Sequence, residues 1–313
     1  MCLMGKNTIY YGFSLPPATG GDFVVLDHIR ALNRMGFDAK AYYGAYDDGY
    51  TKFPVPVARP TAFRPDDILV MGEVHSFDAA RAIPAIKVMH NQNPYMMWFG
   101  IESVAALNAY PLAHILVPSD FTAAKLAEMG VKAPVTRVRP ALPGYFAPAK
   151  KKLQIAYSPN KRSLEAKFLP SYFAAMAPEY EQVPWVKLQG LTREACAEAL
   201  AASAVYAALP LLEGLGLMSL EAMACGCHVV GYSGHGGAEY ATPENGDWIA
   251  DGDHADFAER LREACRLFES QSDNAIIAAG KATAARFNQA DFEAELAAAW
   301  KTILGDKAGL YRL

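Results

Sequence analysis

The segment that decides the fold runs from residue 204 to residue 232 and reads AVYAALPLLEGLGLMSLEAMACGCHVVGY. A strand-length apolar run at Ala204–Leu209 is followed by a turn with two glycines, a helix-length run at Leu217–Ala224 and a second strand-like run at His228–Tyr232. Two apolar strands joined through a helix are typical of a parallel pair, whose crossover needs about a dozen residues. The segment therefore predicts a parallel sheet covered by helices.

The same alternation continues toward both ends of the chain. Further strands are expected at Thr8–Phe13, Ala39–Tyr43, Ile68–Met71, Ile86–His90, Ile115–Pro118, Leu153–Tyr157 and Trp185–Leu188. Further helices are expected at Phe23–Met35, Asp120–Met129, Lys167–Met176, Thr192–Ala201, Ala255–Glu269 and Asp291–Ile303. Strands that alternate with helices form parallel sheets with helices on both faces, so the sequence predicts an α/β fold.

A chain of 313 residues is long enough for two domains of this kind. We expect two Rossmann-like, doubly wound domains that face a cleft, at residues 1–148 and 149–290. A C-terminal helix and tail at residues 291–313 complete the chain. The apolar side of that helix must pack on another element, and packing on the N-terminal domain is one option that the sequence leaves open.

Composition excludes several classes of protein. Hydrophobic residues make up 52% and charged residues 20%, so the chain can bury ordinary cores. Lys and Arg total 29 against 33 Asp and Glu, and this net charge of -4 argues against nucleic-acid binding. The 5 cysteines form no disulfide or zinc pattern, so we expect reduced thiols.

Two further observations bear on location. The sequence has no stretch of about 18 apolar residues, and its first residues lack the apolar core of a signal peptide. We therefore expect a cytoplasmic protein without a transmembrane helix. The basic run at Lys150–Lys152 is most simply a solvated linker, and contact with the inner face of a membrane is the alternative.

The turn before Leu217–Ala224 has the features of an anion site. Gly214 and Gly216 let the backbone approach a ligand closely at the carboxyl edge of the sheet. The first N–H groups of the helix and its dipole favour a phosphate there. Glu213 and Glu221 flank this place, where carboxylates suit neutral hydroxyls such as those on the two rings of a nucleotide sugar. The plainer alternative is a pair of solvent-exposed acids.

Seven residues separate Glu213 from Glu221, within EGLGL and EAMACG. This pattern resembles the donor-binding signature of the group 1 glycosyltransferases (glycosyltransferase family 4), which are retaining enzymes of the GT-B fold. Other stretches similar to the family follow in the same order: Ile115–Ser119, Glu128–Gly130, Val138–Ala141, Phe146–Pro148, His228–Gly231, Gly236–Tyr240, Asn245–Gly246 and Asp251–Asp253. The resemblance covers most of the chain and is strongest over residues 205–253.

The resemblance implies roles for these residues in binding a nucleotide-sugar donor. Glu213 would hold hydroxyls of the donor sugar, and Glu221 would hold those of the ribose. Backbone amides would meet the sugar and diphosphate at Gly214, Leu215, Gly216 and Leu217. The family neutralises the diphosphate with a basic pair, for which the candidates are Lys161 and Arg162, with Lys167 in reserve. Because this region departs from the family's commoner Gly-Arg-Leu…Lys-Gly pattern, plain solvent exposure of these residues is the alternative.

Two features of the first domain are also similar to the family. Gly20 and Gly21 stand between the first strand and the first helix, where the family has a Gly-Gly loop close to the ligand. His90 ends a strand at the expected cleft side, where family members often have a histidine that contacts the donor sugar. A plain hydrogen-bonded histidine is the alternative for His90.

The resemblance implies a glycosyltransferase that moves a sugar from a UDP-, GDP- or TDP-sugar to a hydroxyl of a glycan or lipid-linked acceptor, with retention. It implies no cofactor and no metal ion, and the Asp251-Gly-Asp253 run is expected to cap a helix rather than bind a metal. We expect a role in polysaccharide, glycolipid or other glycan biosynthesis. Two alternatives stay open: a nucleotide-sugar epimerase of the same fold, and a non-catalytic nucleotide-sugar-binding subunit.

Overall fold

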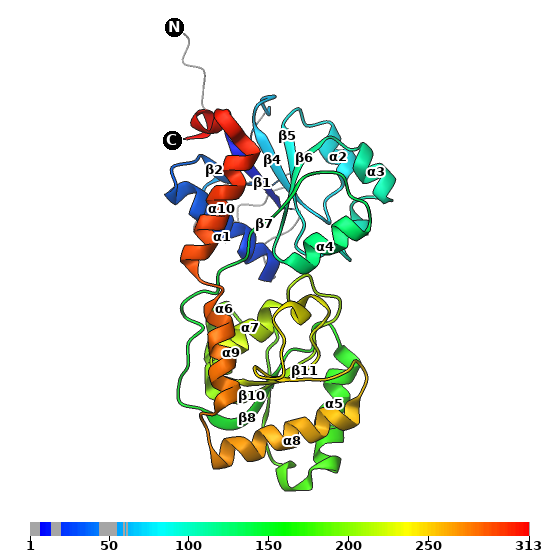
Figure 1. Ribbon diagram of the computed structural model, residues 1–313, viewed down its shortest axis with the longest axis vertical. Helices are drawn as coiled ribbons and strands as arrows, with labels where there is room; N and C mark the ends of the chain where they lie inside the picture. The colour runs from blue at the N-terminus through cyan, green and yellow to red at the C-terminus, as the bar shows by residue number, and fades with distance from the viewer. Residues whose placement is uncertain (1–6, 14–19, 44–54, 59, 61, 313) are drawn as a thin grey trace. The chain divides into compact units, whose positions relative to one another are not determined.

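In the computed structural model, the chain folds into two units (Figure 1). The structure describes residues 7–13, 20–43, 55–58, 60 and 62–312. Unit 1 comprises Met1–Pro140 and Ala290–Leu313, and unit 2 comprises Ala141–Gln289. Both are α/β units with a parallel sheet, as the alternation of strands and helices predicts.

In the described part of unit 1, seven parallel strands form one sheet in the order β3-β2-β1-β4-β5-β6-β7. Their bounds are β1 Ile9–Phe13, β2 Ala39–Tyr43, β3 Val57–Ala58, β4 Ile68–Gly72, β5 Ile86–His90, β6 Leu112–Val117 and β7 Val135–Arg137. The helices of the unit are α1 Gly20–Arg34, α2 Phe77–Arg81, α3 Val104–Ala109, α4 Asp120–Glu128 and α10 Gln289–Leu304. The strand order changes direction beside β1, as in doubly wound sheets that bind ligands at this point.

The helices of unit 1 begin where the sequence supplies a capping hydroxyl. Ser119 accepts a hydrogen bond from the backbone N–H of Thr122 and so caps α4. Ser76 and Ser103 cap α2 and α3 in the same way. Apolar side chains of these three helices pack together on one face of the sheet.

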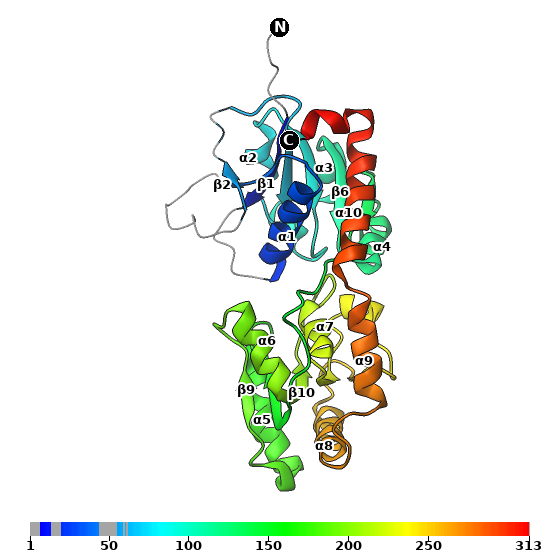
Figure 2. The same cartoon turned by 90° about the vertical axis from the view of Figure 1, so that its left-hand side faces the viewer.

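The other face of the unit 1 sheet carries α1 and α10, which lie side by side in Figures 1 and 2. Trp300 of α10 is fully buried, with its ring 6.5 Å from that of Tyr11 in β1. Phe292 lies 5.3 Å from the ring of His28 in α1. Glu295 accepts hydrogen bonds from the backbone N–H and the guanidinium of Arg139. The last helix of the chain is therefore part of the first unit.

The sheet of unit 2 has five parallel strands among the described residues, in the order β12-β11-β10-β8-β9. They are β8 Lys152–Tyr157, β9 Trp185–Lys187, β10 Ser203–Ala208, β11 His228–Gly231 and β12 Asp247–Trp248. The helices are α5 Ser163–Met176, α6 Arg193–Ala202, α7 Leu217–Ala224, α8 His254–Ser270 and α9 Ala275–Ala285. One apolar cluster packs α6 and α7 against the sheet, and a second packs α5 and α8 against the opposite face.

The boundary between the units lies at Pro140, earlier in the chain than the expected residue 148. The backbone N–H of Leu142 donates to the carbonyl of Phe287 at 2.8 Å, and the side chain of Phe146 is buried in the core of unit 2. Residues 141–148 thus fold with unit 2. Among the described helices, none has both the length and the apolar character needed to cross a bilayer.

Candidate active site

The turn between β10 and α7 is the centre of the candidate site. Gly216 is the N-cap of α7 and has a φ of 84°, a left-handed conformation that favours glycine. No side chain among the described residues caps this helix, so the amide groups of its first turn remain available to an anionic ligand. Gly214, Leu215 and Leu217 lie in the same turn and helix start, where the sequence predicts them.

A second loop, at the start of the 3-10 helix η4 (Gly236–Glu239), is held against this turn. The backbone N–H of Glu213 donates to the carbonyl of Gly234 at 2.8 Å, and the N–H of Gly236 donates to the carbonyl of Glu213 at 3.2 Å. The Tyr240 hydroxyl donates to the carbonyl of Gly216 at 2.6 Å. Backbone hydrogen bonds therefore hold the two loops together and position Glu213.

Two non-glycine residues in these loops have left-handed backbone conformations. Leu212 has a φ of 50° and His235 a φ of 68°. Such conformations cost about 1–3 kcal/mol each and persist where the surrounding structure enforces them, as at ligand sites. The strain lies in the segment that the sequence identifies as the site.

Changing Gly236 to alanine tests how closely the two loops must approach. A Cβ atom there would lie 2.4 Å from the carbonyl carbon of Gly214 and 2.6 Å from the carbonyl oxygen of Glu213. Since both neighbours are backbone atoms, we expect Gly236→Ala to lower the free energy of unfolding by about 1–3 kcal/mol in urea denaturation. Gly144→Ala is the control, because its Cβ would meet nothing within 4 Å. Equal stability of the two variants would contradict the described packing.

Glu213 and Lys161 are brought together, although they are 52 positions apart in the sequence. The Lys161 ammonium lies 2.7 Å from Oε1 of Glu213, with the two side chains 42% and 21% exposed. An exposed pair of this kind contributes little to stability, so its charges remain usable by a ligand. The acid expected to bind sugar hydroxyls is thus beside a cation expected to bind diphosphate.

Arg162 makes contacts of a different kind. Its Nε donates to the carbonyl of Pro210 at 2.8 Å, and its other nitrogens bond to Glu165 and Asp251. The guanidinium also lies 4.5 Å from the ring centre of Tyr232. These contacts fasten the start of α5 to the loops of the site. Lys167 is exposed further along α5.

Asp253 caps α8 by accepting a hydrogen bond from the backbone N–H of Asp256, which confirms the capping role expected for this run. Among the residues that the structure describes, no three His, Cys, Asp or Glu side chains gather so that they could hold a metal ion.

Glu221 lies inside α7 with its carboxylate buried against Arg193, at 2.8 Å from the guanidinium. Burial raises the pKa of Glu221 to about 7, against the opposing effect of Arg193. The alternative that Glu221 is a solvent-exposed acid is therefore wrong. Arg193 was not predicted as a site residue. Its one local signal is a cation in the first turn of a helix, where the helix dipole disfavours it.

His90 ends β5 in unit 1 and is fully buried. Its ring stacks on that of His28 at 4.5 Å, and neither ring nitrogen has a hydrogen-bond partner among the described residues. The alternative that His90 is a plain hydrogen-bonded histidine is therefore not supported by the structure. Burial lowers the pKa of His90 to about 4, so the ring is neutral near pH 7.

Gly20 and Gly21 begin α1, while residues 17–19 of the expected loop lie outside the described residues. The Gly21 carbonyl accepts a hydrogen bond from the side chain of Gln92 at 3.0 Å. Gln92 lies two residues after the end of β5, so the glycines and the end of β5 meet at one edge of the unit 1 sheet.

Two further groups at that edge were missed, although they lie within three residues of the end of β4. Glu73 is buried and accepts a hydrogen bond from the backbone N–H of Gln92 at 3.2 Å. Burial raises its pKa to about 7. Burial lowers the pKa of His75, whose Nδ1 lies 3.2 Å from the Gly72 carbonyl. Polar residues that end a parallel strand were the available signal.

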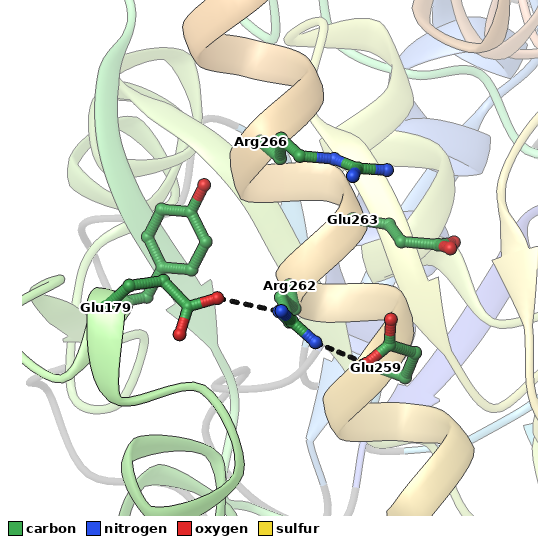
Figure 3. Close-up of a pocket in the computed structure, with 6 residues that line it drawn as sticks. Glu179, Glu259, Arg262, Glu263 and Arg266 are labelled. Carbon is green, nitrogen blue, oxygen red and sulfur yellow. Dashed lines mark hydrogen bonds and ion pairs between the residues drawn. The ribbon is translucent and has the colours of Figure 1, made fainter.

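A separate hollow lies between η3 (Pro178–Tyr180) and α8 (Figure 3). Figure 3 shows Arg262 between Glu179 and Glu259, at 2.7 and 3.3 Å. The charges of these exposed side chains offset one another, and none of the predicted site residues lines the hollow. It contributes nothing to the candidate site.

Comparison with known proteins identifies the family. A model described as "Glycosyl transferases group 1" matches residues 176–282. A protein of Actinobacillus pleuropneumoniae serotype 7 (strain AP76), named alpha-1,6-glucosyltransferase, is 35% identical over an alignment of 305 residues that covers 92% of each chain. The chain belongs to the group 1 glycosyltransferases. The prediction of a group 1 glycosyltransferase, made from the turn before α7, is thereby confirmed, and the protein is a glycosyltransferase. Membership of glycosyltransferase family 4 stays a prediction.

This glycosyltransferase shares its fold with proteins of very different sequence. Alr3699/HepE of Anabaena is 12% identical, with a TM-score of 0.71 over 95% of this chain and 100% of that one. Sucrose-phosphate synthase of Thermosynechococcus elongatus is also 12% identical, with a TM-score of 0.67 over 95% and 99%. At these identities the likeness shows the fold alone, which is the predicted GT-B fold.

Proposed function

We propose that this glycosyltransferase moves glucose from UDP-glucose to a primary hydroxyl of a glycan, with retention and without a metal ion. The 35% identical relative is named an alpha-1,6-glucosyltransferase, and a 1,6 linkage uses the primary hydroxyl of the acceptor sugar. Alr3699/HepE, which has the same fold, was solved with UDP and glucose. The observation that carries the proposal is the Lys161–Glu213 pair beside the uncapped start of α7.

Residues of the turn and of α7 have separate roles in the proposed reaction. Glu213 accepts hydrogen bonds from the hydroxyls of the glucose, and Glu221 from those of the ribose. As the bond from the anomeric carbon to the diphosphate breaks, negative charge gathers on the departing oxygens. Amide groups fixed in place stabilise that charge more effectively than water does, because they need not reorient. We assign this role to the amides of Leu215, Gly216 and Leu217.

Lys161 is the proposed cation for the diphosphate. Its ammonium pairs with the Glu213 carboxylate. The diphosphate offers it a second, more highly charged partner, while Glu213 turns to the sugar. Arg162 is assigned a supporting role, because its donors already bond to Pro210, Glu165 and Asp251. His90, Gly20 and Gly21 of unit 1 keep the donor contacts that the family resemblance implies.

The Lys161→Met variant tests the assignment of the cation. We expect it to raise the dissociation constant for UDP about tenfold and to reduce the dependence of binding on salt, since one charge-assisted contact is lost. Calorimetric titration measures both effects. Lys281→Met, in α9, is the matched control and should bind UDP as the wild type does. Arg162→Met should instead lower the melting temperature, and the reverse pattern would exchange the two roles.

A panel of UDP-, GDP- and TDP-sugars tests the proposed function as a whole. We expect UDP-glucose to release UDP slowly by itself and faster with a glucoside acceptor, at a rate that EDTA leaves unchanged. The anomeric proton coupling of the product should be that of an α-linkage. An isomeric nucleotide sugar would indicate an epimerase instead. Tight donor binding without any product would indicate a non-catalytic subunit.

The acceptor is proposed to be a glycan that is not linked to a lipid, in glycan biosynthesis in the cytoplasm. A lipid-linked glycan at the inner face of the membrane is the second candidate, favoured by the basic run at Lys150–Lys152. Cosedimentation with anionic vesicles separates the two, because only the second requires binding to the vesicles.

A further inference from the structure

A buried ion pair joins α6 to α7 in unit 2. Arg193 is the first residue of α6, and its guanidinium donates to Oε1 of Glu221 at 2.8 Å. The two side chains are only 15% and 8% exposed. The guanidinium also lies 5.5 Å from the ring centre of Phe146. Both helices cover the same face of the sheet, so the pair is fixed by the core of the unit.

Stability alone does not account for this arrangement. Taking two charges out of water costs free energy that their attraction seldom returns in full. A cation in the first turn of α6 is further disfavoured by the helix dipole. Well-packed apolar residues would serve the core at least as well. The pair therefore points to a use of the carboxylate itself.

Among the titratable groups around Glu221, Arg193 is the one that determines the charge of the carboxylate. The other titratable groups that act on the carboxylate or respond to it are Cys196 of α6, Cys225 at the end of α7, Tyr206 of β10 and Tyr240 after η4. Burial raises the pKa of each of them, to about 11 for Cys196 and about 12 for Cys225, so all four are neutral near pH 7. Arg193 is the cation that acts on Glu221 within the described residues.

We propose that Arg193 is a positioning residue that keeps Glu221 ionised and orients it to accept hydrogen bonds from both ribose hydroxyls of the donor. The inference rests on the proposed function, since it deepens the assigned contact between Glu221 and the ribose. Arg193 bonds to Oε1, and Oε2 is the oxygen that we assign to the ribose hydroxyls. A protonated carboxyl would have to donate one hydrogen bond and would lose part of its acceptor capacity.

The consequence is a ribose selectivity that depends on pH. Because the pKa of Glu221 is about 7, the carboxylate is mostly ionised at pH 8 and mostly protonated at pH 6. Loss of charge-assisted hydrogen bonds to the ribose weakens binding about tenfold. We therefore expect UDP to bind about tenfold more tightly than 2′,3′-dideoxy-UDP at pH 8, and this advantage to fall toward pH 6. Titration of the phosphates cancels in the ratio, because both ligands carry the same diphosphate.

Calorimetric titrations of the two ligands at pH 6, 7 and 8 provide the test. In Arg193→Gln we expect the advantage of UDP at pH 8 to fall to about twofold, because Glu221 then stays protonated. Arg193→Lys retains a cation and should keep the advantage within about threefold of the wild type. Arg266→Gln, which changes an exposed arginine of α8, is the matched control. A role in stability alone would shift melting temperatures without changing the ratio.

The outcomes separate this inference from the proposed function. Wild-type protein that transfers glucose from UDP-glucose but binds UDP and 2′,3′-dideoxy-UDP equally at every pH overturns the inference alone. So does an Arg193→Gln variant with the wild-type ratio and pH profile. If the Arg193→Gln variant does not fold, the inference is decided by two other measurements. These are the pH profile of the wild type and the ratio of the two dissociation constants in Arg193→Lys. A protein that binds neither UDP nor UDP-glucose overturns the proposed function, and the inference with it.

Discussion

Replacing Glu213 with glutamine is expected to slow glucosyl transfer from UDP-glucose about a hundredfold. The amide keeps the shape of the side chain but loses its charge and one of its acceptor oxygens. Hydrogen bonds from the sugar hydroxyls to an ionised carboxylate are worth about 1.5–3 kcal/mol, and part of that stabilisation is realised as the sugar gains positive charge. Removal of the acid also frees Lys161, so UDP alone should bind at least as tightly as before.

The measurement is the rate of UDP release with saturating UDP-glucose and acceptor, beside the dissociation constant for UDP. Glu198→Gln is the matched control, because Glu198 is an exposed acid on α6 in the same unit. Its rate should equal that of the wild type. A Glu213→Gln enzyme with wild-type turnover would show that the acid does not hold the transferred sugar.

Truncating Trp300 to alanine is expected to lower the free energy of unfolding by about 3–5 kcal/mol. The side chain is fully buried beside Tyr11, in the helix that covers one face of the unit 1 sheet. Its removal leaves a cavity between α10 and β1 that a parallel sheet cannot collapse to fill. The loss should fall on unit 1, while unit 2 keeps its stability.

Scanning calorimetry with urea denaturation measures this effect, since the two units need not unfold together. Phe99→Ala is the control. That aromatic side chain is also in unit 1 but is 79% exposed, so its truncation should change stability by less than about 0.5 kcal/mol. Equal losses in the two variants would show that α10 does not complete the core of unit 1.

The parts of the fold predicted most closely were those with a clear local pattern. The strands expected at Ala39–Tyr43 and Ile86–His90 and the helix expected at Leu217–Ala224 have the predicted bounds. The two-residue strands β3 and β12 were missed, because two residues cannot display an alternating pattern. Helix α9 was missed as well, since its alanine-rich sequence carries little periodic signal.

The residues of the site also divide into those that the sequence predicts and those that it does not. Glu213 and the glycines were readable because they lie close together in one turn. The partners of Arg162 could not be predicted in this way. Pro210 and Asp251 are 48 and 89 positions away in the sequence, and only the folding of the sheet brings them close to Arg162. The buried charge pair of Arg193 and Glu221 likewise depends on how α6 packs beside α7. Local sequence shows which chemistry is present, while the fold determines which charges meet.

The return of α10 to unit 1 reverses the usual order of events during synthesis. Domains that emerge first from the ribosome generally fold first. Here the sheet of unit 1 is translated early, but the face that it shares with α1 stays partly uncovered until Trp300 and its neighbours leave the exit tunnel. Unit 2 is complete at Gln289 and can fold sooner. A stop codon or fusion partner placed shortly before residue 290 would therefore damage the half of the enzyme that the cell makes first.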